Sequence, residues 1–402
     1  MFASPRRLHL WLLCTNDRPV EKMLYIWPAL PIVLVHQRRN LWKQGVNNII
    51  HALKHYDRVY RIDLSVINPL LKKMAAMKGP FPALTYLELL SGRKIQVLPD
   101  SFLGGSAPHL RSVKFYGIAY PGLPKLLSST HDIVHLHLRD IPYSGYISPE
   151  AMATCLTALT QIENFSLHFR SPRYDRATQG RSQLRHTPFV LPALREFSFT
   201  GDSDYLERII TPINAPALMR IYIKFFNQLV FKTPSLRQFI GRTEASKAFW
   251  GVVVSFRKGS ARLTLVGGDY YPSFDLGISS RMLDWQLSSV AQLCKSSLPP
   301  LPALECLKLF QDRRHSQDDI EDIQWLEILH PFTQFTSVKD LVLSGPLVQH
   351  VARTVQKMSG ERLIEVLPGL QGSWRTGRRQ PEEHIQEPFS SWSLPDGSLV
   401  FP

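Results

Sequence analysis

Four histidines, His131, His135, His137 and His168, are the residues whose type and spacing best suit chemistry. Imidazole binds transition metals and exchanges a proton near neutral pH. His135 and His137 share one face of a strand, and His168 would lie two residues off register on the next strand. A metal site needs three or four converging ligands with supporting hydrogen bonds. Exposed histidines on an open binding face explain the group as well, so we expect no bound metal.

Other motifs that carry chemistry are absent from the sequence. It contains no phosphate-binding glycine loop, no dinucleotide fingerprint, no zinc-protease motif and no serine-hydrolase motif. The cysteines Cys14, Cys155, Cys294 and Cys306 have no paired spacing. They therefore indicate buried thiols in a reducing compartment, and neither a zinc site nor a disulfide framework. We predict no catalytic residue, no cofactor and no enzymatic activity.

The histidines lie in or beside short segments of the form L-x-x-L-x-L, which are predicted to be strands. Four of them begin at Leu84, Leu110, Ile133 and Ile162, in steps of 26, 23 and 29 residues. This pattern and period are typical of leucine-rich repeats, in which each unit supplies one short strand and one helical return. The last two apolar residues of a segment share one side of the strand, and stacking the units buries them in a continuous core.

The fold class predicted from these repeats is α/β. We expect a leucine-rich-repeat-like solenoid over residues 1–370, with parallel strands on its concave face and helices on its convex face. Strand-like segments parted by Lys258-Gly259 and Gly267-Gly268 predict an irregular β-meander around residues 250–280. Residues 170–187 hold five arginines and few apolar residues, which indicates an inserted mobile loop. The polar residues 371–402 are predicted to form a disordered tail.

Local signals mark where individual elements begin. Ser148 followed by Pro149 and Glu150 is a strong helix start, and Thr233-Pro234 is expected to cap a second, shorter helix. A Pro-x-Leu pattern precedes several predicted strands, where proline is expected to set the chain into an extended run. It begins at Pro82, Pro108, Pro192, Pro216 and Pro302.

The outward residues of the predicted strands form the candidate binding site. Their side chains are rich in Tyr, His, Arg and Lys, types that are enriched at protein interfaces. An ordinary solvated sheet face would look similar, but solenoids present extended concave surfaces for binding, and we favour that interpretation. The candidate residues are Tyr86, Glu88, Lys114, Tyr116, His135, His137, Arg139, His168, Arg220, Tyr222 and Lys224.

The net charge of +14 raises the alternative of a basic nucleic-acid-binding repeat protein. Much of the excess lies in segments that look unstructured, such as Arg170–Arg185 and Arg375–Arg379, so we do not expect nucleic acid as the partner. A steep loss of affinity with salt would support that alternative. No stretch approaches 18 apolar residues, so we expect no membrane span and place the protein in the cytoplasm or nucleus.

Several strings in the chain resemble F-box proteins of a large family expanded in mushroom-forming fungi. The similarity runs from about Phe2 to Leu370. The strings are SPRRL at Ser4–Leu8, WPALPI at Trp27–Ile32, PDSFLGGSAP at Pro99–Pro108, DIPYSGYISPEA at Asp140–Ala151 and DWQLSS at Asp284–Ser289.

The resemblance implies the substrate-binding part of a Skp-cullin-F-box ubiquitin ligase receptor. In such proteins an F-box of about three helices binds the Skp adaptor, and a leucine-rich-repeat-like region selects the protein to be ubiquitinated. The F-box is expected immediately before Ser4–Leu8, and we expect it to be missing from this chain. The predicted partner is therefore a protein target of unknown identity, with the Skp adaptor and cullin as partners only where an F-box lies upstream.

Overall fold

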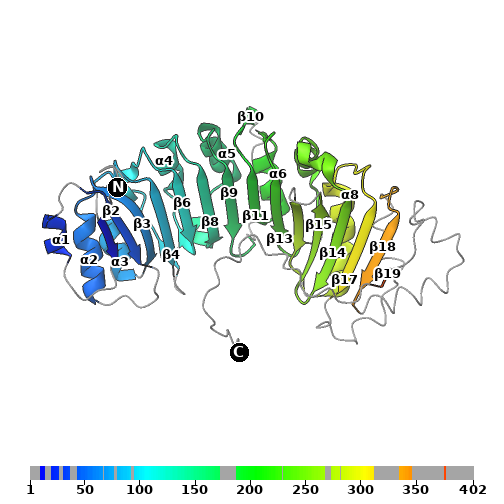
Figure 1. Ribbon diagram of the computed structural model, residues 1–402, viewed down its shortest axis with the longest axis horizontal. Helices are drawn as coiled ribbons and strands as arrows, with labels where there is room; N and C mark the ends of the chain where they lie inside the picture. Colours follow the sequence, from blue (N-terminus) through cyan, green and yellow to red (C-terminus); the bar gives the residue numbers. More distant parts are fainter. Residues whose placement is uncertain are drawn as a thin grey trace, which may run out of the picture.

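The structure is a mixed α/β chain built on one large, mostly parallel sheet that does not close on itself (Figure 1). It is a computed structural model of the 402-residue chain. It describes residues 10–13, 20–26, 30–36, 43–66, 68–76, 79–91, 95–172, 187–228, 230–267, 273–280, 282–311, 335–345 and 375–376.

Within these residues, strands of the large sheet lie side by side along the long axis of the molecule (Figure 1). Except at β14, β15 and β16, neighbouring strands pair in parallel and follow the order of the sequence. In spatial order the strands are β1 (Leu10–Leu13), β2 (Ile32–His36), β3 (Val59–Val66), β4 (Tyr86–Ser91), β6 (Ser112–Tyr116), β8 (His135–Ile141), β9 (Asn164–Phe169), β11 (Glu196–Gly201), β13 (Arg220–Phe225), β16 (Ser273–Ile278), β15 (Ser260–Val266), β14 (Gly251–Arg257), β17 (Cys306–Gln311), β18 (Asp340–Ser344) and β19 (Arg375–Thr376).

Helices and two small sheets complete the connections between these strands. The small sheets pair β5 (Gln96–Val97) with β7 (Ile118–Ala119), and β10 (Phe189–Val190) with β12 (Ile213–Asn214). The helices are α1 (Glu21–Ile26), α2 (Lys43–Leu53), α3 (Asn68–Ala75), α4 (Leu123–Ser128), α5 (Pro149–Ala158), α6 (Ser203–Ile210), α7 (Pro234–Gly241) and α8 (Leu283–Ser297), with 3-10 turns η2 (Phe102–Gly105), η3 (Tyr143–Gly145) and η5 (Glu244–Ala248).

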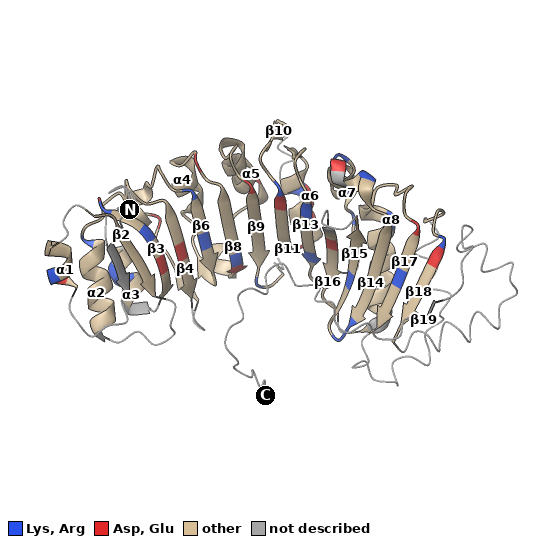
Figure 2. Cartoon of the chain, in the orientation of Figure 1, with Lys and Arg blue, Asp and Glu red and all other residues tan. Residues whose placement is uncertain are grey.

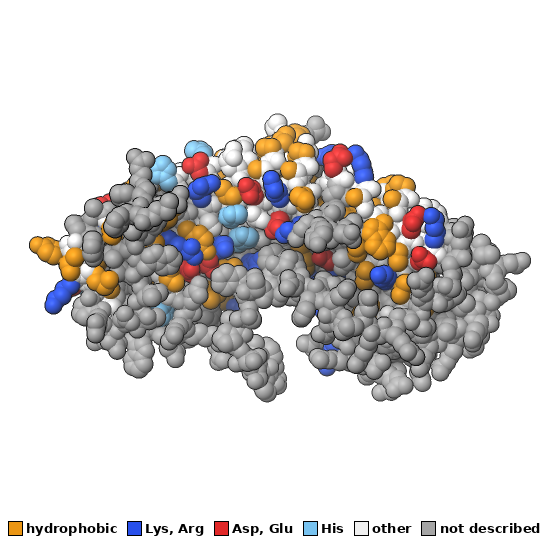
Figure 3. Space-filling model, viewed as in Figure 1, with side chains coloured by type: hydrophobic (Ala, Val, Ile, Leu, Met, Phe, Trp, Pro, Cys, Tyr) orange, Lys and Arg blue, Asp and Glu red, His pale blue; other side chains and the backbone are white. Residues whose placement is uncertain are grey.

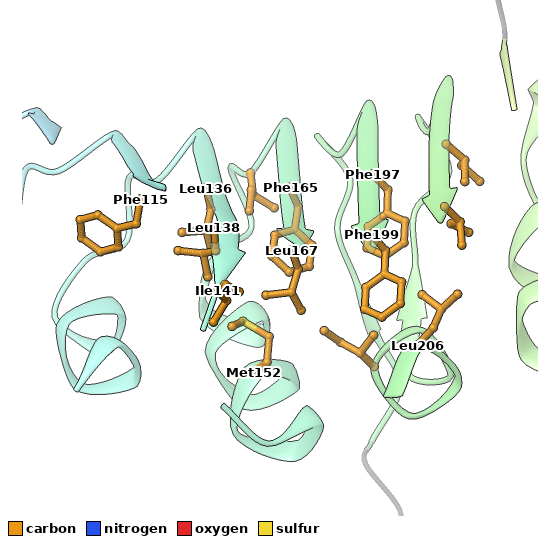
Figure 4. Packing of buried hydrophobic residues seen from close by; sticks show 14 of the residues in the cluster. Phe115, Leu136, Leu138, Ile141, Met152, Phe165, Leu167, Phe197, Phe199 and Leu206 are labelled. Atoms are coloured by element: carbon orange, nitrogen blue, oxygen red, sulfur yellow. The ribbon is translucent and has the colours of Figure 1, made fainter. Parts of the chain in front are cut away.

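The core lies between the strands and the helices. Figure 4 shows Leu136 and Phe165 projecting from β8 and β9 toward the side of the sheet on which α5, with Met152, lies. These positions form continuous apolar rows because the parallel register places Leu136 opposite both Val113 and Phe165. The first apolar residue of each predicted repeat is also buried, although it lies just before its strand. The alternation predicted from L-x-x-L-x-L therefore sets which side of each strand is apolar.

A tight turn precedes many strands and explains the Pro-x-Leu pattern. The amide of Leu84 donates to the carbonyl of Phe81, so Pro82 occupies the second position of a turn, where its fixed φ is favoured. The strand begins only at Tyr86, two residues later than the extended run that proline was expected to start. The same hydrogen bond, from an amide to the carbonyl three residues earlier, is made by the amides of Leu110, Ile162, Leu194, Leu218, Leu304 and Val338.

The predicted meander is present and is part of the large sheet. β14 pairs with β15, and β15 with β16, in antiparallel fashion. Because three antiparallel strands restore the original direction, β16 lies parallel to β13 and β14 lies parallel to β17. After β13 the chain first forms β14, the strand of the meander that lies farthest from β13. The spatial order of the three strands is therefore the reverse of their order in the sequence.

Other expectations fall partly or wholly outside the described residues. Positions 173–186 of the predicted loop and most of the predicted tail lie there, while Arg375–Thr376 within the tail pair with β18. The described cysteines, Cys155, Cys294 and Cys306, are buried free thiols. None of the described helices is long and apolar enough to cross a membrane.

The two predicted helix starts have different outcomes. Ser148 accepts a hydrogen bond from the amide of Ala151 at 3.2 Å, which confirms it as the cap of α5. Thr233 is the N-cap residue of α7, as predicted, but its hydroxyl makes no capping bond and lies 2.6 Å from that of Ser297. The carboxylate of Glu207 on α6 instead accepts from the first amides of α7, Ser235 at 2.8 Å and Leu236 at 2.9 Å. One helix therefore caps the next.

Replacing Glu207 with alanine is expected to lower the free energy of unfolding by about 1 kcal/mol, as loss of a helix cap usually does. The substitution leaves two amides of α7 without their acceptor. Glu207→Gln, which keeps one oxygen acceptor, should cost less. Urea midpoints of the three proteins measure the effect. Equal losses for the two variants would contradict the capping role.

Candidate functional site

The side of the sheet away from the helices, called here the open face, carries the candidate residues in three rows. The first row holds Arg61, Tyr86, Ser112, His135, Asn164, Glu196 and Arg220. The second row holds Asp63, Glu88, Lys114, His137, Ser166, Ser198, Tyr222, Asp275 and Thr264. The third row holds Ser65, Leu90, Tyr116 and Arg139 and, beyond an irregularity in β8, His168, Thr200, Lys224, Gly277 and Arg262.

All the binding residues predicted from the sequence lie on this face. Figure 2 shows basic and acidic bands interspersed along the strands, and Figure 3 shows histidines near the middle of the surface. Ser166 pairs with His137, and His168 follows Ser166 by two residues, which is the offset that the spacing predicts. The alternation of each strand is therefore sufficient to bring these side chains onto one surface.

One end of the face is a linked aromatic and charged cluster centred on Tyr86. The guanidinium of Arg61 lies 3.9 Å from the centroid of the Tyr86 ring and donates to Asp63 at 3.0 Å. The Tyr86 hydroxyl donates to the carboxylate of Glu88, and the ammonium of Lys114 lies 3.9 Å from that carboxylate. Burial and the bond to Glu88 raise the pKa of Tyr86, so it remains a protonated donor. These contacts restrict the side chains before any partner arrives.

The middle of the face pairs each strand histidine with a polar residue on the neighbouring strand. His135 Nδ1 lies 2.8 Å from Asn164 Oδ1, and His137 Nδ1 lies 2.9 Å from Ser166 Oγ. The two imidazoles stack with their centroids 6.3 Å apart. His168 in the same region uses its other ring nitrogen, Nε2, which contacts the hydroxyl of Ser198.

Electrostatics keep two of these histidines neutral. Burial, followed by the charges of Lys114 and Arg139, lowers the pKa of His137 to about 3. Burial, followed by the charge of Arg139 and the neighbouring His137 and Lys224, lowers the pKa of His168 to about 3. Both rings are therefore uncharged near neutral pH and act as hydrogen-bonding groups.

The serine–histidine pairs have the contact distance of a nucleophile and its base. His168 Nε2 lies 2.6 Å from the hydroxyl of Ser198, and His137 Nδ1 lies 2.9 Å from that of Ser166. An imidazole whose pKa is near 3 is a weak base at pH 7, since general-base catalysis is most effective when the pKa lies near the working pH. Ser166 is only 3% exposed and Ser198 only 4%. These features favour a structural role for both pairs.

The histidines do not converge as metal ligands. His131 is exposed in the segment before β8, while His135, His137 and His168 each use a ring nitrogen on an amide or hydroxyl of the next strand. In the part of the chain that the structure describes, no three His, Cys, Asp or Glu side chains gather so as to hold a metal ion.

The other end of the face is centred on Tyr222. Its ring centroid lies 6.3 Å from that of His168, and the guanidinium of Arg262 lies 5.7 Å from it. Asp275 accepts a hydrogen bond from Thr264 at 2.5 Å, and burial raises its pKa.

Sequence reasoning missed Arg61, Asp63, Arg262 and Asp275 as members of the face. Arg61 and Asp63 alternate with buried residues of β3, so the rule that found Tyr86 would also have found them. Arg262 and Asp275 lie on the meander, and their place beside Tyr222 follows from its reversed strand order. That order depends on pairing between distant segments, which local spacing does not encode.

The described open face thus combines fixed aromatic rings, cations, carboxylates and neutral imidazoles over neighbouring strands. Such a surface is able to form hydrogen bonds, ion pairs and ring contacts with an extended partner. Half-buried positions on it, such as Lys114 and Tyr222, leave their side chains partly accessible. The chain matches no protein-family model, no curated protein and no solved structure.

Proposed function

We propose that this chain is a leucine-rich-repeat-like solenoid whose open face recognises another protein without catalysing a reaction. The recurring turn before the strands supports the repeat interpretation, since the bond from Leu84 to Phe81 is repeated at Leu110 and Leu194. Strands that pair in sequence order, with helices in the connections, support it further. The meander at β14–β16 is then a departure from the repeat.

The continuous, internally bonded open face is the observation that carries the functional proposal. Contacts such as Tyr86 to Glu88 and His135 to Asn164 hold side chains in place across neighbouring strands. A partner that binds such a surface orders few additional side chains, so less of its binding energy is lost as entropy. Tyrosine and arginine, which occur in all parts of the face, are the residue types that most often dominate protein interfaces.

We further propose that the protein acts as the substrate-binding part of a ubiquitin ligase receptor of the F-box family that the sequence resembles. In this role the open face selects the protein to be modified. The Skp adaptor and cullin would join through an F-box upstream of the repeats. The cytoplasm and nucleus, where thiols such as Cys294 stay reduced, are the proposed locations.

Nucleic-acid binding is the alternative that the net charge raises, and the open face gives it less support. Carboxylates at Asp63, Glu88, Glu196 and Asp275 alternate with the cations. A polyanion lying across the strands would meet these negative charges at several positions. A protein partner with charges of both signs fits the same surface better.

The proposal is tested by capture of partners from an extract of cells that express the protein. The full chain is compared with Tyr116→Ala and Tyr222→Ala, which remove aromatic rings from the open face. A genuine partner should then be purified and its affinity measured directly. Each substitution is expected to weaken it about tenfold or more, because central tyrosines are frequent hot spots.

Tyr25→Ala is the matched control, because Tyr25 is exposed on α1 and lies outside the open face. It should leave the affinity unchanged. Recovery of the Skp adaptor and cullin together with a face-dependent partner would support the ligase role. If every captured protein bound the three variants and the unmodified chain equally, or if nucleic acid alone were enriched, the proposal would be wrong.

A further inference from the structure

The third row of the open face contains two cations on either side of a glycine. Gly277 on β16 is paired with Lys224 on β13 and with Arg262 on β15. Arg262 reaches back across β16, because its guanidinium lies 5.7 Å from the ring of Tyr222 on β13. Lys224 and Arg262 therefore flank a position that has no side chain of its own.

The positive character of this region extends toward β8. Arg139 and Lys224 both contribute to the lowered pKa of His168, after burial as the largest cause, so both charges act on the same ring. Between His168 and Arg262 the described third row holds no carboxylate. The row's own residues therefore place no carboxylate beside Lys224 or Arg262.

The nearest carboxylates lie in other rows or at the margin of the face. Asp275, in the second row, accepts the bond from Thr264. Glu196, in the first row, forms an ion pair with Arg220. Asp140 is exposed at the end of β8, at a positive φ of 55° just after Arg139. None of the three occupies the position between Lys224 and Arg262.

We propose that the third row, from Arg139 through Lys224 and Gly277 to Arg262, binds carboxylates of an extended acidic segment in the partner protein. This inference rests on the proposed function, since it names the chemistry of the partner at the same face. One carboxylate would lie above Gly277, between the ammonium and the guanidinium. Guanidinium and ammonium groups form their strongest hydrogen bonds with such ionised acceptors.

The dimensions of the row suit a short peptide that crosses the strands. Five strand spacings separate β8 from β15 in the sheet, which is about 24 Å, or about seven residues of extended chain. A peptide with glutamates or aspartates at intervals can place its carboxylates on the cations of the third row without lying over Glu196 or Asp275. A nucleic-acid backbone, with a charge on every nucleotide, would meet those two side chains, and this favours the acidic peptide.

The experiment measures the affinity of the full chain for a labelled peptide of alternating glutamate and serine, about eight residues long. The comparison peptide has glutamine in place of glutamate. The decisive variants are Gly277→Asp, which places a carboxylate between Lys224 and Arg262, and Gly277→Asn, which adds a similar volume without the charge. A Cβ at Gly277 would meet its nearest atoms at 3.7 to 3.8 Å, an ordinary contact, so both variants should fold.

The glutamate peptide is expected to bind at least tenfold more tightly than the glutamine peptide, and Gly277→Asp to weaken it about tenfold, which corresponds to about 1.4 kcal/mol. Gly277→Asn should change the affinity by less than about threefold. Lys224→Gln and Arg262→Gln should each weaken binding even if the glycine variants fail to fold. Lys247→Gln, at an exposed lysine paired with Glu244, should have no effect.

Several outcomes would overturn the inference. They are equal affinity for the two peptides, equal weakening by Gly277→Asp and Gly277→Asn, and a single-stranded oligonucleotide that displaces the peptide and binds more tightly. A partner that depends on Tyr116 and Tyr222 but ignores Gly277→Asp would also overturn it, while leaving the proposed function in place. Peptide binding that responds to Gly277→Asp, without any face-dependent protein partner, would support the cationic site and contradict the proposed function.

Discussion

Leu136→Asp and Leu138→Asp are each expected to abolish cooperative folding of the sheet. Leu136 is 0% exposed and Leu138 is 3% exposed. Figure 4 shows both side chains on the core side of β8. Removing a buried leucine costs about 2 to 5 kcal/mol, and burying an unpaired carboxylate adds several more. Since domains are stable by only about 5 to 15 kcal/mol, either substitution removes most of the available stability.

Circular dichroism during thermal unfolding and limited proteolysis measure this loss. His137→Ala is the control, because His137 lies between the two leucines and faces the other way, with a single bond to Ser166. It should cost about 1 kcal/mol and preserve a cooperative transition. If His137→Ala unfolded the protein as completely as Leu136→Asp, the assignment of the two strand faces would be wrong.

The same alternation explains why so much of the face was predictable from the sequence. In β4, β6, β8 and β9 the apolar residues of L-x-x-L-x-L are buried, so the strand residues that alternate with them are directed to the open face. Ser148 was equally predictable as a helix cap, because its partner amide is three residues away. Features determined within one turn or one strand are encoded locally.

Features that depend on distant contacts were not predictable in this way. Thr233 looks like a cap in sequence, but Glu207 takes that role because α6 and α7 lie side by side. The meander was recognisable, yet its reversed order, which brings Arg262 near Tyr222, follows from pairing between β16 and β13. Likewise, the lowered pKa of His168 depends on burial and, after it, on charges contributed by β8 and β13. Each of these is a tertiary effect between segments well separated in sequence.

The half-buried histidines His137 and His168 should make the protein markedly less stable in mild acid. The pKa of His137 and of His168 is about 3 in the folded chain, against 6.5 for an unperturbed histidine. Below pH 6.5 the unfolded state therefore binds more protons than the folded state, and stability falls as the pH decreases toward 3. It is highest above pH 6.5, where both rings are neutral in both states.

The expected loss between pH 7 and pH 5 is about 3 kcal/mol for the two histidines together. One pKa unit corresponds to about 1.4 kcal/mol, and solvent screening makes the loss smaller than the full shift because both rings keep some contact with water. The groups that face them are cations or another imidazole: Lys114, Arg139, Lys224 and His135. The raised pKa values of Glu207 and Asp275 act in the opposite direction, since those carboxyls favour the folded state when protonated.

A double variant isolates the contribution of the histidines from that of the carboxyls. His137→Asn places an amide where Nδ1 contacts Ser166, and His168→Gln places one where Nε2 contacts Ser198. Neither amide titrates, so urea midpoints of the variant should fall much less between pH 7 and pH 5 than those of the unmodified chain. The two proteins would lose the same stability only if the rings accepted protons in the folded state as easily as in water. That result would contradict the desolvation of His137 and His168, and with it the neutral, pre-organised imidazoles at the centre of the face that is proposed to recognise a protein.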